Sequence, residues 1–152
     1  MKSGPEGGPW GSIAEPVQLY DNLNSFRYFY DLDIPVIAAI RGVCLGSALE
    51  LALFCHARIC GKGSVLGLPE ASFGLIPGCG GIQNINALAG RPRALELILS
   101  GSSFTAEDAL NWKIVDKIVP KKDIVDTAIQ IIKNAGTRYN RFSIRSRIDK
   151  YL

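Results

Sequence analysis

The chain has 152 residues, which is enough for one domain of ordinary size. Hydrophobic residues make up 47% and charged residues 20%, a balance that predicts a packed core and excludes a disordered chain. The net charge of +3 is too small to indicate nucleic-acid binding, although it is compatible with a ligand that carries phosphate.

Membrane, secretory and metal-binding signals are missing from the sequence. No apolar run reaches the length of a membrane span, and the first residues contain no apolar signal region. We therefore expect a cytoplasmic protein with no membrane partner. Location in an organelle is the alternative that stays open. The lone histidine, His56, is expected to be structural. The cysteines fit no zinc or haem spacing and are expected to be reduced and mostly buried: Cys44, Cys55, Cys60 and Cys79.

Short helices and strands are expected to alternate along the first half of the chain. Leu19, Leu23 and Phe26 recur at helical spacing, whereas the apolar run 36–40 is typical of a strand buried on both faces. In chain order we expect a loop, a helix, a strand, a turn, a helix and two strands, at residues 1–12, 16–30, 36–40, 42–47, 47–55, 57–60 and 65–68.

The second half opens on a loop in which Gly and Pro dominate, and helices follow. Pro92 suits the first turn of a helix, and Thr105 with the acids after it resembles a helix N-cap. In chain order we expect a glycine-rich loop, two helices, a capped helix start, a strand and two helices, at residues 74–81, 82–88, 92–99, 105–108, 114–119, 123–135 and 140–152. This alternation predicts the α/β class.

Three features of these elements are able to support chemistry. The amides at the start of the helix near Ser47 have no backbone partner and favour an anion or a developing oxyanion, although many α/β folds leave such a turn unused. Glu50 lies among leucines in that helix, so it is either buried or on the solvent face. Glu70 follows Pro69 in a loop, where a surface glutamate is equally compatible with the pattern.

Taken in order, these segments resemble the crotonase superfamily, and enoyl-CoA hydratases most of all. The two longest matching segments, residues 34–52 and 67–81, are IPVIAAIRGVCLGSALELA and GLPEASFGLIPGCGG. Shorter matches lie at 99–101, 106–109 and 115–120. The resemblance implies a truncated, crotonase-like ββα spiral core. That core would occupy residues 1–135 without the earliest strands, and 136–152 would begin the C-terminal helical region.

The resemblance also implies a reaction and a site. Glu50 and Glu70 would be the catalytic acids, which add water syn across a 2-enoyl-CoA thioester. The backbone N–H groups of Ser47 and Ser3 would form the oxyanion hole, which is commonly the largest single contribution in such sites. Gly78 and Gly46 would belong to the water and substrate site. The CoA thioester is the substrate, and the resemblance implies neither a metal nor another cofactor.

Several alternatives stay open at this point. A Δ3-Δ2-enoyl-CoA isomerase needs mainly the carboxylate at Glu70. A polyketide-type relative would act on acyl groups held by an acyl carrier protein, and a non-catalytic module would keep only the fold. Gly78 stands where dienoyl-CoA isomerases and 3-hydroxyisobutyryl-CoA hydrolases carry an acid, which argues against both. The resemblance implies a homotrimer or hexamer and does not give the acyl-chain length.

Overall fold

The structure is a computed structural model that describes residues 26–136, 148–150 and 152. Residues 26–31 are helical. The elements that follow are β1 (Ile37–Ile40), β2 (Val43–Leu45), α2 (Ser47–Leu53), β3 (Ala57–Gly61), β4 (Val65–Gly67), η1 (Pro69–Phe73), α3 (Gly81–Ala89), α4 (Arg91–Ser100), β5 (Ser103–Thr105), α5 (Ala106–Asn111), β6 (Lys117–Val119), η2 (Lys121–Asp123) and α6 (Ile124–Ala135).

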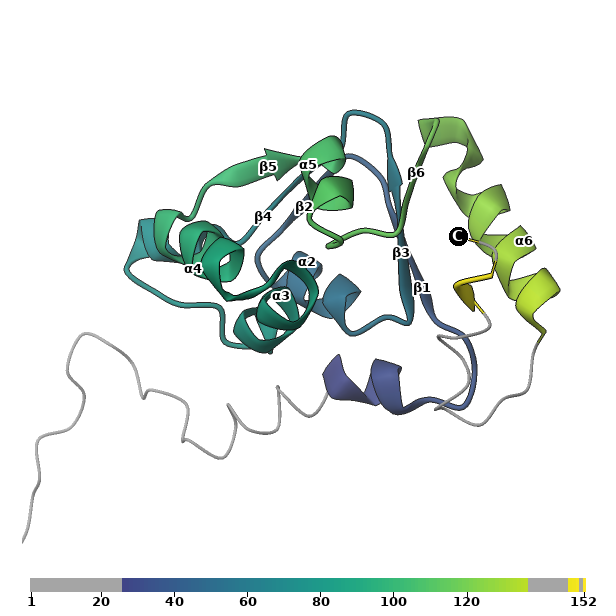
Figure 1. The fold of residues 1–152 in the computed structure, drawn as a ribbon, viewed down its shortest axis with the longest axis horizontal. Helices are drawn as coiled ribbons and strands as arrows, with labels where there is room; N and C mark the ends of the chain where they lie inside the picture. The colour runs from purple at the N-terminus through teal and green to yellow at the C-terminus, as the bar shows by residue number, and fades with distance from the viewer. Residues whose placement is uncertain (1–25, 137–147, 151) are drawn as a thin grey trace, which may run out of the picture.

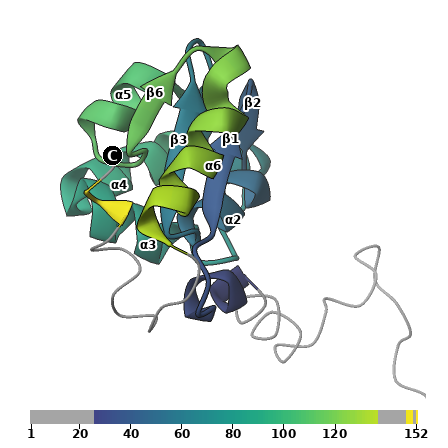
Figure 2. The ribbon, with the colours of Figure 1, turned by 90° about the vertical axis from the view of Figure 1, so that its right-hand side faces the viewer.

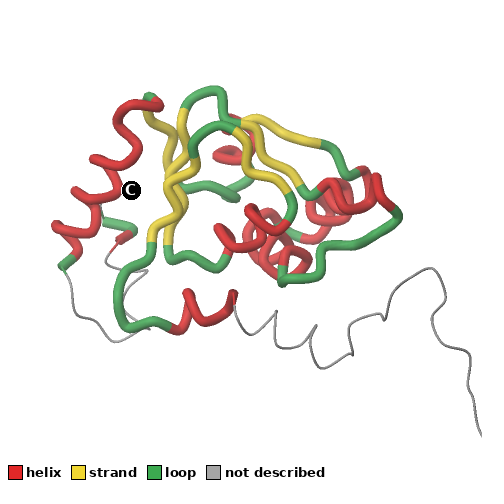
Figure 3. Tube along the Cα trace, turned by 180° about the vertical axis from the view of Figure 1, so that it is seen from behind, coloured by secondary structure: helices red, strands yellow, loops and turns green. Residues whose placement is uncertain are grey.

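Two small sheets organise these elements (Figure 1). The first has the strand order β1-β3-β6 and is parallel throughout. The second has the order β2-β4-β5, with β2 parallel to β4 and β4 antiparallel to β5. Figure 3 shows the strands in yellow, with helices on both sides of them. The expected α/β class is therefore confirmed.

The same two passages of chain build both sheets. Residues 37–45 supply β1 and then β2, while residues 57–67 run beside them and supply β3 and then β4. The Ser64 hydroxyl accepts a hydrogen bond from the Gly42 N–H at 3.0 Å, which joins the two passages where each changes sheet. α2 is the connection between them, so its start follows β2 and its end precedes β3.

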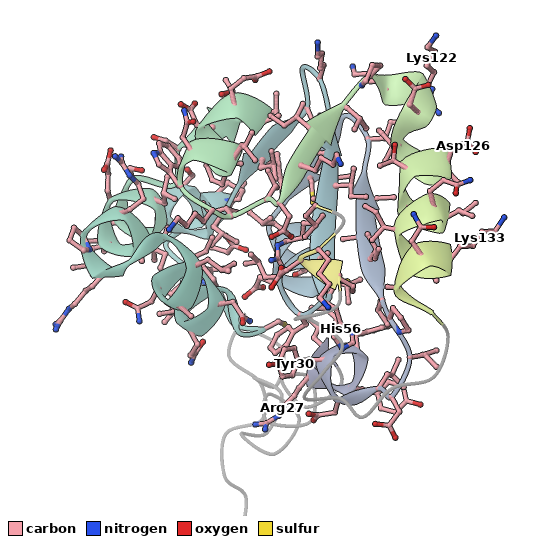
Figure 4. All side chains as sticks on the ribbon, turned by 45° about the vertical axis from the view of Figure 1, so that its right-hand side comes forward. Arg27, Tyr30, His56, Lys122, Asp126 and Lys133 are labelled. Atoms are coloured by element: carbon pink, nitrogen blue, oxygen red, sulfur yellow. The ribbon has the colours of Figure 1, made fainter. Side chains whose placement is uncertain are left out.

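Two clusters of buried apolar side chains hold the layers together. The larger cluster lies between the sheets and α2, α3, α4 and α5, and includes Leu49, Leu66 and Ile85. The smaller one lies under α6 and includes Ile59, Ile131 and Ile148. Figure 2 shows α6 across one face of β1 and β3, with the other helices behind the sheet. The outer side of α6 carries the charged residues Asp126 and Lys133, and Lys122 lies in η2 just before the helix (Figure 4).

Most of the expected elements within the described residues are confirmed, with corrections to two strands and one turn. The run 36–40 does contain β1, but the strand is not buried on both faces, because Ala39 is exposed. The expected turn 42–47 contains β2. The expected strand 114–119 shortens to β6, because Ile114 and Val115 are buried in the turn that precedes it.

The helix signals agree with the structure where it describes them. Pro92 lies in the first turn of α4, and Thr105 caps α5 in a reciprocal capping box with Asp108. The expected loop 1–12 and most of the expected helices 16–30 and 140–152 lie outside the described residues. Within the described parts of the chain, every helix is too short or too polar to pass through a lipid bilayer.

Candidate active site

Glu50 is buried and is held by backbone amides from a distant part of the chain. Its side chain lies in the middle of α2, and the residue is 1% exposed. One carboxylate oxygen, Oε1, accepts hydrogen bonds from the Cys79 N–H at 2.8 Å and from the Gly81 N–H at 2.9 Å. Gly81 is the first residue of α3, so the positive end of that helix dipole also favours the carboxylate. This pair of N–H donors, from Cys79 and Gly81, is called the amide clamp below.

The amide clamp depends on close contact between α2 and the glycine-rich loop. A Cβ placed on Gly81 would lie 2.9 Å from Glu50 Oε1, which is closer than side-chain contacts allow. One helical turn further along α2, the ring of Phe54 lies against Gly80, where an added Cβ would come within 2.5 Å of a ring carbon. The loop therefore needs glycine at both positions to reach α2.

Glu70 occupies the first turn of η1, directly after Pro69. A Cβ placed on Gly46 would lie 3.1 Å from Glu70 Oε1, so the carboxylate rests against the backbone that leads into α2. The other oxygen, Oε2, is buried and accepts no hydrogen bond from the residues that the structure describes. A buried carboxylate oxygen without a donor is costly, and a bound water or ligand group would supply the missing donor.

Cys79 lies close enough to both carboxylates to be affected by each charge. Burial raises the pKa of the half-buried Cys79 thiol, and the negative charges of Glu50 and then Glu70 raise it further. The thiol therefore stays protonated near neutral pH. This shared neighbour brings Glu50, from α2, and Glu70, from η1, to the same small region of the molecule.

The start of α2 lies beside this region. The hydrogen-bond ladder of the helix begins with the Glu50 N–H, which donates to Gly46 O at 3.0 Å, so the amide of the exposed Ser47 precedes the ladder. Gly46 is anchored by its own N–H, which donates to Gly67 O at 2.9 Å. Its φ of 56° lies in the left-handed region, which favours glycine.

The structure thus brings together four of the six residues expected in the site, namely Glu50, Glu70, Gly46 and Ser47. Gly78 lies next to Cys79 in the same loop and is exposed. Ser3 lies outside the described residues. The sequence interpretation missed the part that Cys79, Gly81 and Phe54 play around Glu50. The signal for it was the pair of glycines that follows Cys79 and begins a helix.

Two other features lie away from the carboxylates. His56 is buried, and its Nδ1 accepts a hydrogen bond from the Val36 N–H at 3.1 Å, while its ring stacks on Tyr30 (Figure 4). The structural role expected for His56 agrees with these contacts. Among residues 26–136, 148–150 and 152, no three His, Cys, Asp or Glu side chains gather as a metal site would require.

Hollows on the surface differ in their relation to the site. One hollow of about 620 Å³ lies between α3, α4 and α5 around Trp112 and is lined by neither carboxylate. A smaller and more apolar groove of about 310 Å³ runs along β1, β2 and α2, and Ala48, Leu51 and Ala52 contribute to its wall. The apolar groove is therefore the one that adjoins the start of α2, where Ser47 lies.

Comparison with known proteins identifies the family of the chain. The family model for enoyl-CoA hydratase/isomerase matches residues 16–140, which is most of the chain. The chain belongs to the enoyl-CoA hydratase/isomerase family. The resemblance to the crotonase superfamily stated from the sequence is therefore confirmed.

Solved structures of similar proteins confirm the crotonase-type fold. An enoyl-CoA hydratase from Bacillus anthracis is 32% identical, with a TM-score of 0.78 over 91% of this chain and 54% of that chain. DspI from Pseudomonas aeruginosa is 29% identical, with a TM-score of 0.79 over 93% of this chain and 57% of that chain. ThnE from S. clavuligerus is 25% identical, with a TM-score of 0.74 over 88% of this chain and 67% of that chain. This member of the family thus spans little more than half the length of the first two.

Proposed function

We propose that this chain is an enoyl-CoA hydratase, which adds water across the double bond of a 2-enoyl thioester. The observation that supports the proposal is a pair of carboxylates near Cys79, one fixed by the amide clamp and the other with a buried oxygen that has no donor among the described residues. Hydration needs two such groups, because one must hold and deprotonate water while the other delivers a proton to carbon.

In the proposed reaction, the water molecule binds between Glu50 and Glu70. Glu50 holds the water and takes one of its protons as the oxygen attacks Cβ of the substrate. Glu70, which is in its carboxylic acid form in the reacting complex, delivers its proton to Cα on the same face, so that OH and H are added syn. After the addition Glu50 is protonated and Glu70 is a carboxylate, and transfer of the proton from Glu50 to Glu70 completes the cycle.

Negative charge develops on the thioester oxygen during this addition. The Ser47 amide, ahead of the α2 ladder, is the donor that we assign to this oxygen, and the Ser3 amide is the second donor that the resemblance implies. Losing one donor of this kind typically raises the barrier by about 3 kcal/mol. Because these dipoles polarise the thioester, the proposed reaction needs neither a metal nor an organic cofactor.

The test is hydration of crotonyl-CoA, followed by the loss of ultraviolet absorbance of the conjugated thioester. Glu50→Gln and Glu70→Gln should each lower kcat by about 10²- to 10⁴-fold, the usual range for a lost general acid or base. Glu107→Gln is the matched control, because Glu107 is an exposed glutamate in the first turn of α5. Unchanged rates in both site variants would contradict the two-carboxylate mechanism.

Isomerisation of a 3-enoyl to a 2-enoyl thioester is the second candidate function. The Oε2 atom of Glu70, which has no donor in the described part of the chain, favours it, because one carboxylate suffices to carry a proton between two carbons of the substrate. A 3-enoyl-CoA substrate separates the two reactions. An isomerase would convert 3-enoyl-CoA at an unchanged rate in Glu50→Gln and would lose that activity in Glu70→Gln. A hydratase would lose the hydration of crotonyl-CoA in both variants.

Two further measurements concern substrate and assembly. Comparing crotonyl-CoA with the same acyl group on an acyl carrier protein shows which carrier is used, and equal use of the free CoA thioester removes the need for a carrier protein. We expect a homotrimer or hexamer, which light scattering at known protein concentration would show. A folded protein that fails to bind acetoacetyl-CoA in calorimetry would instead be a non-catalytic module.

A further inference from the structure

The glycine-rich loop meets α2 at two points that are one helical turn apart. Glu50 lies under the amides of Cys79 and Gly81, and Phe54 lies under Gly80. Residues four apart share one face of a helix, so a single face of α2 carries both contacts. The position of the loop and the position of the Glu50 carboxylate are therefore set by the same surface.

The glycine at position 81 is required by space and not by backbone conformation. Its φ lies outside the left-handed region, so an alanine there would meet no backbone strain. An added Cβ would nevertheless lie 2.9 Å from Oε1 and 3.0 Å from Cγ of Glu50, and 3.1 Å from Cβ of Pro77. The Pro77 ring is fixed to the backbone, whereas Oε1 is the end of a flexible side chain, so Glu50 is the neighbour that would have to move.

The geometry points to Gly81 as a positioning residue for the reaction, acting through Glu50. Its missing side chain lets Oε1 reach both clamp amides, which fixes the carboxylate and leaves its second oxygen for the water molecule. This inference rests on the proposed hydration and extends it, since Gly81 touches the catalytic carboxylate and has no expected contact with the substrate.

The first experiment compares the steady-state kinetics of Gly81→Ala with those of the wild type. A displacement of about 1 Å in a catalytic group costs about 10²-fold in rate, so kcat should fall by about that factor. KM should stay within about twofold, because the thioester is held elsewhere. Gln83→Ala is the control, since Gln83 is exposed in the same helix.

A double-mutant cycle separates positioning from a general structural effect. If Gly81 acts through Glu50, Gly81→Ala should cause no further loss of kcat in the Glu50→Gln background, because that contribution is already gone. A structural defect would instead lower the residual rate of Glu50→Gln by the same factor as in the wild type.

Thermal unfolding provides a readout that is independent of activity. Gly81→Ala should lower Tm when Glu50 is present and should not lower it in the Glu50→Ala background, where the crowded carboxylate is absent. If Gly81→Ala alone fails to fold, the same comparison still tests the positioning role, because the double variant Gly81→Ala with Glu50→Ala should then fold.

Three outcomes are distinguishable. A coupled loss of kcat and Tm supports the inference. An active wild type with an unaffected Gly81→Ala variant overturns the positioning role and leaves the proposed hydration standing. A wild type that turns over no enoyl thioester overturns both, whereas the Tm comparison still shows whether Gly81 and Glu50 are coupled.

Discussion

Cys79 reports on the two carboxylates at the scale of single residues. Burial, Glu50 and Glu70 all raise the pKa of its thiol, so little thiolate is present near neutral pH. Glu50→Gln and Glu70→Gln each remove one negative charge, and each should speed the reaction of Cys79 with iodoacetamide at pH 8. Mass spectrometry identifies the labelled residue, with Cys79→Ser as control. A rate that responds to only one substitution would contradict the convergence of both acids.

Lys113 has a backbone conformation that normally belongs to glycine. It follows the end of α5 with a φ of 62°, and among the described residues it is the only non-glycine residue with a positive φ. The left-handed conformation costs about 1 kcal/mol for a residue with a Cβ. Lys113→Gly should therefore raise the free energy of unfolding by up to about 1 kcal/mol in urea titrations. Lys113→Ala keeps the Cβ and should bring no such gain.

Single residues of the site differ in how far the sequence predicts them. Glu50 and Glu70 stand out because carboxylates are unexpected in an apolar helix and after a proline, and the resemblance fixes their pairing. Cys79 and Gly81 contribute backbone amides, whose partners depend on how α3 packs against α2. The glycines after Cys79 indicate a close approach of the backbone, but only the folded chain shows that Glu50 is the partner of these amides.

At the scale of elements, Arg58 connects three segments. From the buried strand β3 its guanidinium donates to Ile114 O at 2.7 Å and to Cys55 O at 2.9 Å, and it pairs with Asp116 at 3.2 Å. Removing one partner of a buried ion pair typically costs about 3–5 kcal/mol. Arg58→Leu should lower the free energy of unfolding by that amount.

The matched comparison for this prediction is Arg27→Leu. Arg27 pairs with Asp31 on an exposed helix face, where such pairs contribute less than about 1 kcal/mol. Denaturant titrations of both variants give the two values. Equal losses in the two variants would show that the Arg58 network adds nothing beyond a surface pair.

Element prediction succeeds where periodicity or capping is strong and fails for the shortest strands. α4 and α5 begin at Pro and Thr signals that have a direct physical cause. β2 and β5 have three residues each, too few for an alternating pattern, and only pairing with β4 defines them. The sequence also did not predict the exposure of Ala39, because an apolar run does not tell which face of the strand is covered.

At the scale of the whole molecule, a buried thiol makes the free energy of unfolding change with pH in the alkaline range. Burial, followed by the neighbouring Cys60 thiol, raises the pKa of Cys44 in the core to about 11. The folded state therefore holds this proton more tightly than the unfolded state does. The protonated Cys44 thiol therefore stabilises the folded state fully below about pH 9, and this stabilisation is lost as the pH rises through about 11. The loss in the free energy of unfolding amounts to about 3 kcal/mol.

The measurement is the free energy of unfolding between pH 8 and 11 for the wild type and Cys44→Ala. The variant leaves a small cavity and should be less stable at pH 8. Its free energy of unfolding should nevertheless fall less steeply with pH, because one titrating thiol is missing. Parallel curves would show that Cys44 does not titrate with folding.

The two ends of α2 are tied to the neighbouring chain passages. The Gly46 N–H donates to Gly67 O at 2.9 Å, and the His56 N–H donates to Val36 O at 2.8 Å. A helix anchored in this way cannot open locally without separating both sheets. The amide protons of Gly46 and His56 should therefore exchange with deuterium only through global unfolding, and they should be among the slowest in the chain. Glu50, which lies between these two anchors, should therefore keep its place until the whole molecule unfolds.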